Sequence, residues 1–183
     1  MNIVEEVRRV AAEADCLHSG EAVRTAIAAM ASAITRRLSE SHPIVLSVLN
    51  GGIFFTGELV LQLPFPLELD SIKAGRYQGA TRGSEMRWQL TPAVPLVGRT
   101  VLIVDDILDE GVTLAEIARY CREAGAAEVL TAVLIDKQTG RDKPCRPDYT
   151  GLTTENRYLF GYGLDYKNHL RNWPGIYACK TVY

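Results

Sequence analysis

The stretch VLIVDDILDEGVT, which spans Val101–Thr113, decides the fold. It begins with four β-branched or aliphatic residues, which is typical of a strand covered by helices on both faces. Asp105 and Asp106 follow, and then a polar turn, Asp109–Thr113, that contains a glycine. In open parallel α/β sheets, ligands bind at the carboxyl ends of strands, where the next loop and helix N-terminus present N–H groups to an anion. The stretch therefore predicts a buried strand that leads into a phosphate-binding loop.

The three carboxylates of this stretch restrict what the ligand can be, because negative side chains beside a phosphate would repel it. Asp105 and Asp106 are suited either to accept hydrogen bonds from a ribose diol or to face a hydrated Mg²⁺. Asp109 is suited to act as a general base. The alternatives are an acidic pocket of the response-regulator kind and a surface turn with solvated side chains.

Composition points to one globular domain. The chain has 183 residues, 47% of them hydrophobic and 23% charged, which is enough to bury a core without disulfides or metal. A formal net charge of −2 provides no electrostatic reason to expect nucleic acid or an anionic membrane as a partner. No segment approaches the roughly 20 consecutive apolar residues that cross a bilayer.

Cysteine usage indicates a reducing compartment. The four cysteines are widely spaced, with no C-x-x-C pair and no histidine at ligand spacing, which argues against a zinc site and a disulfide framework. The N-terminus lacks the basic segment and apolar run of a signal peptide. We therefore expect a cytoplasmic protein.

Hydrophobic periodicity predicts alternating helices and strands, and hence an α/β fold with a mostly parallel sheet flanked by helices. The predicted helices are Ile3–Ala14, Gly20–Leu38, Phe54–Leu63 and Val112–Glu123. The predicted strands are Ile44–Leu49, Leu67–Ala74, Met86–Leu90, Val101–Val104, Val129–Ile135, Tyr158–Gly161 and Ile176–Lys180. We expect the irregular last third to form a small flap or hood on the main sheet, without a core of its own, so that residues 1–183 make a single domain.

The polar segment Gly75–Arg87 contains three glycines and several arginines. A stretch this long within a compact domain is typically a lid, a binding loop or disordered. We expect a flexible lid, with Arg76 and Tyr77 as its functional residues.

Four segments in order resemble type I phosphoribosyltransferases, specifically the hypoxanthine-guanine branch of that family. They are Val48–Gly52, Val101–Thr113, Leu134–Lys137, and Phe160–Tyr166 followed by Arg171. The resemblance covers about Val45 to Lys180. It implies transfer of a 5-phosphoribosyl group from phosphoribosyl diphosphate to hypoxanthine or guanine in purine salvage, giving IMP or GMP and pyrophosphate.

The resemblance also implies residue roles around the phosphoribosyl donor. Asp105 and Asp106 match the acidic pair that contacts the ribose hydroxyls, and Asp109 matches the residue that takes the proton from the purine's N7. The 5′-phosphate would bind the turn formed by Asp109, Glu110, Gly111, Val112 and Thr113. The pyrophosphate would bind Asn50, Gly51, Gly52 and Arg171. The family often has a cis peptide before the residue aligned with Asn50.

The base-binding segment, about residues 137–175, carries the remaining implied roles. Lys137 matches the lysine that donates to the purine's 6-oxo group, and Tyr158 matches the aromatic residue that stacks on the base. Leu159 and Asp165 would contact the ring edges through their backbone. Asp165 also matches a carboxylate near Mg²⁺, the cofactor that the family implies. The family further implies a homo-oligomer, either a dimer or a tetramer.

Several positions depart from the commonest family pattern. Glu110 replaces a small hydroxyl residue, while Val112 and Asn50 stand where many relatives carry lysine, so cationic support for the phosphates is thinner. Lys73, Arg76 and Arg82 are candidates to compensate. Two alternatives stay open: a xanthine-preferring enzyme, and a nucleotide-sensing regulator without catalysis on the same fold.

Overall fold

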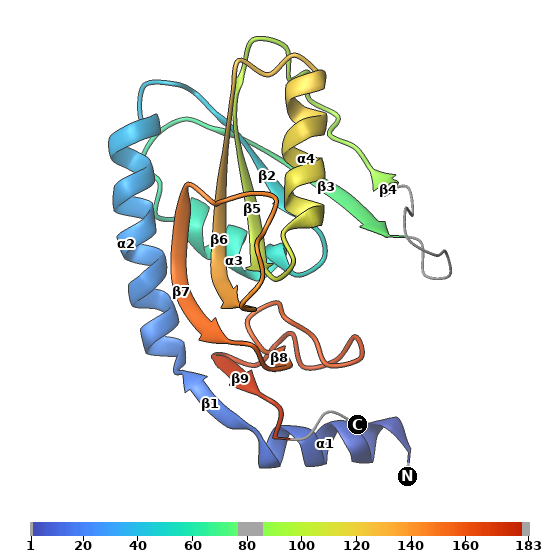
Figure 1. Ribbon diagram of the computed structural model, residues 1–183. Coiled ribbons are helices and arrows are strands. Elements are labelled where there is room, and N and C mark those ends of the chain that lie inside the picture. Colours follow the sequence, from blue (N-terminus) through green and yellow to red (C-terminus); the bar gives the residue numbers. More distant parts are fainter. Residues whose placement is uncertain (1, 77–85, 181–183) are drawn as a thin grey trace.

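A six-stranded sheet forms the body of the protein (Figure 1). The computed structural model describes residues 2–76 and 86–180. The strand order is β4-β3-β2-β5-β6-β7, and β4 alone runs antiparallel to its neighbour. The strands are β2 (Ile44–Val48), β3 (Glu68–Arg76), β4 (Met86–Leu90), β5 (Thr100–Leu108), β6 (Glu128–Gln138) and β7 (Tyr149–Glu155). The predicted α/β fold with a mostly parallel sheet is confirmed.

Helices cover both faces of this sheet. The helices α2 (Gly20–Leu38) and α3 (Gly52–Val60) lie on one face, and α4 (Val112–Glu123) lies on the other (Figure 1). Alternate residues of β5 serve the two layers, since Leu102 and Val104 pack with α2 and α3 while Val101 and Ile103 pack with α4. Successive strand side chains point to opposite faces, which explains why the strand is apolar throughout.

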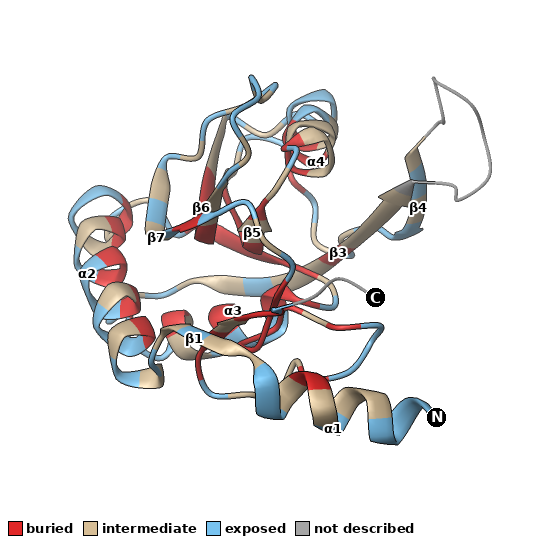
Figure 2. Cartoon of the chain, turned by 60° about the horizontal axis from the view of Figure 1, so that its bottom comes forward, coloured by how far each residue is buried: buried red, intermediate tan, exposed pale blue. Residues whose placement is uncertain are grey.

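Burial is concentrated where these layers meet. Red, buried segments occupy the central strands and the inward faces of the three helices, and pale exposed segments lie on the outside (Figure 2). No helix among residues 2–76 and 86–180 is long and apolar enough to span a membrane.

A second, three-stranded sheet forms the hood, with the order β1-β9-β8. Its strands are β1 (Asp15–His18), β8 (Leu159–Phe160) and β9 (Ile176–Ala178), and the helix α1 (Ile3–Glu13) lies beside it (Figure 1). The N-terminal segment thus helps to build what we expected to come from the C-terminal segment alone.

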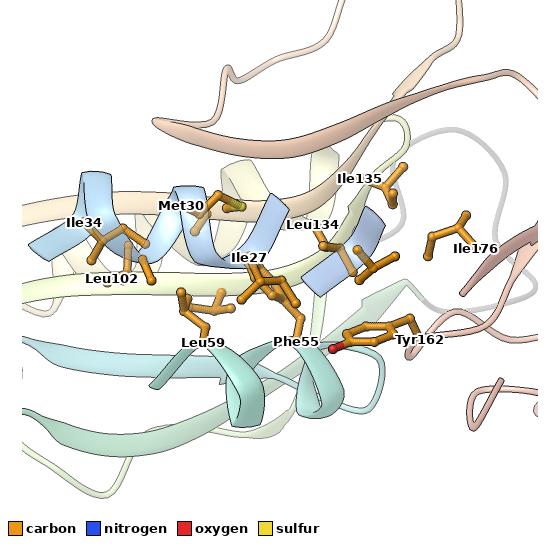
Figure 3. Close-up of a cluster of buried hydrophobic side chains, with 14 of the residues drawn as sticks. Ile27, Met30, Ile34, Phe55, Leu59, Leu102, Leu134, Ile135, Tyr162 and Ile176 are labelled. Carbon is orange, nitrogen blue, oxygen red and sulfur yellow. The ribbon is translucent and has the colours of Figure 1, made fainter. Parts of the chain in front are cut away.

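The expectation that the hood lacks a core of its own was wrong. Val10 of α1 forms a separate buried cluster with Phe160, Tyr166, Leu170 and Cys179. The larger core is nevertheless shared, because Tyr162 and Ile176 pack with Ile27, Phe55 and Leu134 of the main body (Figure 3). The hood is therefore joined to the main sheet by continuous apolar packing.

The structure corrects several predicted boundaries. The strand expected to end at Val104 continues to Leu108, so Asp105 and Asp106 belong to β5 itself. The helix expected from Phe54 begins at Gly52, and the strands β1 and β7 were not predicted. The ends of the expected lid, Gly75–Arg76 and Met86–Arg87, are paired strand residues, and residues 77–85 lie outside the described part of the chain.

Candidate active site

A cavity of about 950 Å³ opens at the carboxyl ends of the central strands. Most residues singled out in the sequence line it. These are Gly51, Asp105, Asp106, Asp109, Glu110, Gly111, Val112, Thr113, Lys137, Tyr158, Leu159, Asp165 and Arg171. They come from four separate parts of the chain, so the fold brings together what the sequence separates.

A few predicted residues lie elsewhere. Asn50 is exposed and Gly52 is buried, and neither lines the cavity. Lys73 in β3 does not line it either. Tyr77 and Arg82 lie outside the described residues.

The acidic pair forms the floor of the cavity. Asp105 and Asp106 are each 8% exposed, and the Asp106 N–H donates to Oδ1 of Asp105 at 2.9 Å. Burial raises the pKa of Asp105 well above its usual range, and the neighbouring Asp106 charge raises it further. Burial also raises the pKa of Asp106, an effect that Arg171 partly opposes. Buried carboxylates of this kind favour a ligand that supplies hydroxyl donors or positive charge.

The loop after β2 approaches this floor closely. The Leu49–Asn50 peptide bond is cis, as the resemblance suggested. A Cβ added to Gly51 would lie 1.7 Å from Oδ2 of Asp106, and one added to Gly163 would lie 2.1 Å from the Gly51 carbonyl oxygen. Only glycine fits at either position, because any side chain would overlap these atoms.

The turn after β5 is shaped to bind an anion. Gly111 adopts a left-handed conformation with φ of 78° and directly precedes α4. Neither α3 nor α4 has a side-chain cap at its N-terminus, whereas Asn2 caps α1 and Ser19 caps α2. The N-terminal N–H groups of a helix need an acceptor. The uncapped ends of α3 and α4 are therefore candidate sites for phosphate groups.

Asp109 and Lys137 form an ion pair across the cavity. The Lys137 ammonium lies 3.0 Å from Oδ2 of Asp109, and the two side chains are 13% and 48% exposed. Lys137 lies near the end of β6 and Asp109 follows β5, so pairing of these parallel strands brings the two groups together.

The opposite wall comes from the hood. Arg171 forms an ion pair with Oδ1 of Asp165 at 2.6 Å and donates to the Gly163 carbonyl at 2.5 Å. The Tyr158 ring meets the Tyr166 ring edge-on, with centroids 5.6 Å apart. Glu6 of α1 accepts hydrogen bonds from the Tyr166 hydroxyl at 2.5 Å and the Lys167 ammonium at 2.7 Å. The N-terminal helix therefore supports the aromatic pair beside the cavity.

Sequence reasoning included the loop between β6 and β7 in the base-binding segment but named none of the loop's residues. Thr139, Arg141, Asp142, Lys143 and Pro144 all line the cavity. A polar loop with mixed charges carries no periodic signal. Its only sequence cue is its position directly after Lys137, at the carboxyl end of a predicted parallel strand.

The cavity carboxylates suit Mg²⁺ better than a metal held entirely by protein. Across residues 2–76 and 86–180, no group of three or more His, Cys, Asp or Glu side chains is arranged to hold a metal ion. Mg²⁺ usually binds one or two carboxylates together with substrate phosphates and water. Both Asp165 oxygens already have partners, Arg171 and the Asn168 N–H, so a metal there would share the carboxylate with them.

Comparison with known proteins identifies the family of this chain. Residues 13–167 match the phosphoribosyl transferase domain family. The hypoxanthine-guanine phosphoribosyltransferase of Streptococcus pneumoniae is 35% identical, over 90% of this chain and 92% of the relative. The hypoxanthine-guanine-xanthine phosphoribosyltransferase of Tritrichomonas foetus is 32% identical, over 91% and 92%.

A solved hypoxanthine-guanine-xanthine phosphoribosyltransferase superposes with a TM-score of 0.82 at 30% identity, covering 91% of this chain and 97% of the other. The fold, the order of the motifs and the similarity along the chain all indicate the same family. This chain belongs to the phosphoribosyltransferase family, in its hypoxanthine-guanine branch.

Proposed function

We propose that this protein is a purine salvage enzyme that transfers the 5-phosphoribosyl group from phosphoribosyl diphosphate to hypoxanthine or guanine. The products are IMP or GMP and pyrophosphate. One observation carries the proposal: a single cavity combines the buried acidic pair, two uncapped helix N-termini and the Asp109–Lys137 ion pair. The names of the similar proteins support it.

The donor would bind along the floor. Its 5′-phosphate accepts hydrogen bonds from the Asp109–Thr113 turn at the start of α4, where the left-handed Gly111 turns the backbone into the helix. The ribose hydroxyls donate to Asp105 and Asp106. The pyrophosphate lies by Asn50, Gly51 and Gly52, with Arg171 able to neutralise charge on the leaving group.

The base would bind against Lys137 and Asp109. The 6-oxo oxygen and N7 lie on the same edge of a purine, which matches a lysine donor 3.0 Å from a carboxylate acceptor. Lys137 donates to the 6-oxo oxygen, and Asp109 takes the N7 proton as N9 attacks the sugar carbon. Adenine offers a donor at position 6, so Lys137 disfavours it. Tyr158 stacks on the ring, and the backbone of Leu159 and Asp165 contacts its edges.

Mg²⁺ is the proposed cofactor, and Asp165 is the residue that would help to hold it beside the substrate pyrophosphate. When bound, it neutralises charge on the departing pyrophosphate. Arg171 orients Asp165 through the 2.6 Å ion pair, and both residues line the cavity.

The proposal also covers the domain organisation, the lid, the cellular location and the oligomeric state. The shared core of hood and sheet supports one domain over residues 1–183. We propose that Arg76 and Tyr77 belong to a lid that excludes water from the reacting sugar. We also propose a cytoplasmic homo-oligomer, either a dimer or a tetramer, whose partners are the small-molecule substrates.

The direct test incubates the purified protein with Mg²⁺, phosphoribosyl diphosphate and each of hypoxanthine, guanine, xanthine and adenine in separate reactions. We expect nucleotide formation with hypoxanthine and guanine and none with adenine. Faster turnover of xanthine would indicate the xanthine-preferring alternative. Nucleotide binding without turnover of any base would indicate a regulator.

A further inference from the structure

Lys143 has an environment that its position in a polar loop does not suggest. Its side chain is only 13% exposed, although it lies in the loop between β6 and β7. Its ammonium donates to the Asp136 carboxylate at 2.6 Å, the Lys137 carbonyl at 2.7 Å and the Leu108 carbonyl at 2.9 Å. An ammonium has three N–H donors, so all of them are used inside the protein.

The three acceptors belong to the two strands that carry the proposed catalytic pair. Leu108 is the residue directly before Asp109, and Lys137 is the proposed purine-recognition lysine itself. Lys143 therefore connects the backbone beneath Asp109 to the backbone of Lys137. These are the two residues whose side chains lie 3.0 Å apart above this junction.

The packing of the same loop against the phosphate-binding turn is an independent observation. A Cβ added to Gly111 would meet Lys143 Cβ and Pro144 Cδ at 3.4 Å. The Cys145 Sγ lies 3.3 Å from the Gly111 carbonyl oxygen. Residues 143–145 thus pack against the phosphate-binding turn. Lys143 also links Leu108, at the start of that turn, to β6 through its hydrogen bonds.

We propose that Lys143 is a positioning residue that holds the 5′-phosphate turn and Lys137 in a fixed relation, and so sets the spacing between the two substrates. This inference rests on the proposed function. Reaction requires the purine nitrogen and the sugar carbon to be held at attack distance, and small displacements reduce the rate strongly. Lys143 lines the cavity, but its three donors are taken by protein acceptors, so it acts on both binding sites through the backbone carbonyls that it holds.

The test compares Lys143→Met with Lys180→Met. Methionine keeps the length of the side chain but removes its charge and donors. Lys180 is a matched control because it is 58% exposed and its carboxylate partner, Asp15, is 3.8 Å away. Steady-state rates yield kcat and the Michaelis constants for hypoxanthine and phosphoribosyl diphosphate. Calorimetry measures the affinity for IMP. The kinetic and the calorimetric measurements are made well below the melting temperature of each variant.

In Lys143→Met we expect both Michaelis constants to rise about tenfold or more and IMP binding to weaken similarly, the usual scale for losing charged hydrogen bonds. Lys143→Arg should restore most of this, and Lys180→Met should match the wild type. Unchanged Michaelis constants, or an increase for one substrate only, would overturn the proposal, because a shared support must affect both sites.

Two further measurements distinguish failure of the Lys143 proposal from misfolding of the variant and from failure of the proposed function. If Lys143→Met does not fold, Asp136→Ala removes one of the three acceptors and should raise both constants by a smaller factor, whereas no change would overturn the proposal. If the wild type forms no nucleotide, the proposed function fails. The IMP affinities then still decide whether Lys143 organises the site: weaker binding in Lys143→Met supports that role and equal binding refutes it.

Discussion

The floor and the hood-side wall of the cavity are held in place by different interactions. Asp105 and Asp106 on the floor are part of a strand that is hydrogen-bonded to β2 and β6, and Gly51 lies against them without space for one more carbon. The wall depends on side-chain contacts such as Arg171–Asp165 and Glu6–Tyr166, with Arg171 and Asp165 24% and 30% exposed.

This difference indicates which residues of the site can exchange a protein contact for a ligand contact. Backbone pairing and close packing leave the floor one arrangement, because moving it would break a strand ladder. Partly exposed ion pairs contribute little free energy, so wall residues can exchange a protein partner for a ligand at small cost. Substitutions on the floor should therefore affect both stability and activity, and those on the wall mainly substrate affinity.

The largest effect is expected from Gly51→Ala. The added methyl group would lie 1.7 Å from the Asp106 carboxylate and must displace the loop or the acidic pair. We expect activity to fall by about 100-fold or more, since displacements near 1 Å have effects of this size. Gly57→Ala, in the helix α3 that begins directly after Gly51, is the control, because nothing lies within 4 Å of the added carbon. It should retain activity and raise the unfolding free energy by roughly 0.5–1 kcal/mol. Equal activity in both variants would contradict a rigid floor.

Asp109→Asn separates chemistry from binding at the boundary between floor and wall. The amide oxygen can still accept from Lys137, but it takes the N7 proton poorly. We expect kcat to fall by about 100-fold with a much smaller change in the Michaelis constant for hypoxanthine, which steady-state kinetics will measure. A loss confined to the Michaelis constant would exclude Asp109 as the base.

Asp105→Asn should stabilise the protein while impairing catalysis. Burial raises the pKa of Asp105, so the folded protein holds a proton that the unfolded chain releases. The unfolding free energy of the wild type should therefore fall as the pH rises from the ordinary aspartate pKa through the raised value, and then level off. Denaturant melts without Mg²⁺ or substrate should show the variant to be the more stable at neutral pH, with the gain vanishing in acid. Parallel pH profiles would contradict this.

The smallest effect is expected from Glu6→Gln, which probes the outer support of the wall. Hydrogen bonds from Lys167 and Tyr166 lower the pKa of Glu6. Its contribution to stability is present above the ordinary glutamate pKa and is lost as the pH falls through the lowered value. We expect about a twofold rise in the Michaelis constant for the base and no change for phosphoribosyl diphosphate, because the Lys167–Glu6 ion pair is partly exposed and lies outside the cavity. Glu13→Gln on the same helix is the control, and equal effects of the two variants would refute the support.

Local patterns predicted the parts of the fold that depend on local rules. The apolar run of β5 required two covering layers, and α2 was predicted with its observed ends, Gly20 and Leu38. The edge strand β7 was missed, because its mixed burial shows no alternation and its strand conformation depends on pairing with β6. The strand β1 was missed for a similar reason, since its partner β9 lies at the other end of the chain.

The sequence by itself predicted the parallel α/β core and half of the residues that line the cavity. The core follows from periodicity, the residues of the Asp105–Thr113 stretch follow from polar residues and a glycine at the end of a buried strand, and the residues from Lys137 onward follow from the resemblance to the family. Only the tertiary structure decided how the parts meet. Glu6 and Tyr166 are 160 residues apart, and Lys143 and Leu108 are 35 apart, yet both pairs are hydrogen-bonded. Such contacts arise when packing of the sheets and helices fixes distant segments side by side, which no local pattern of residues encodes.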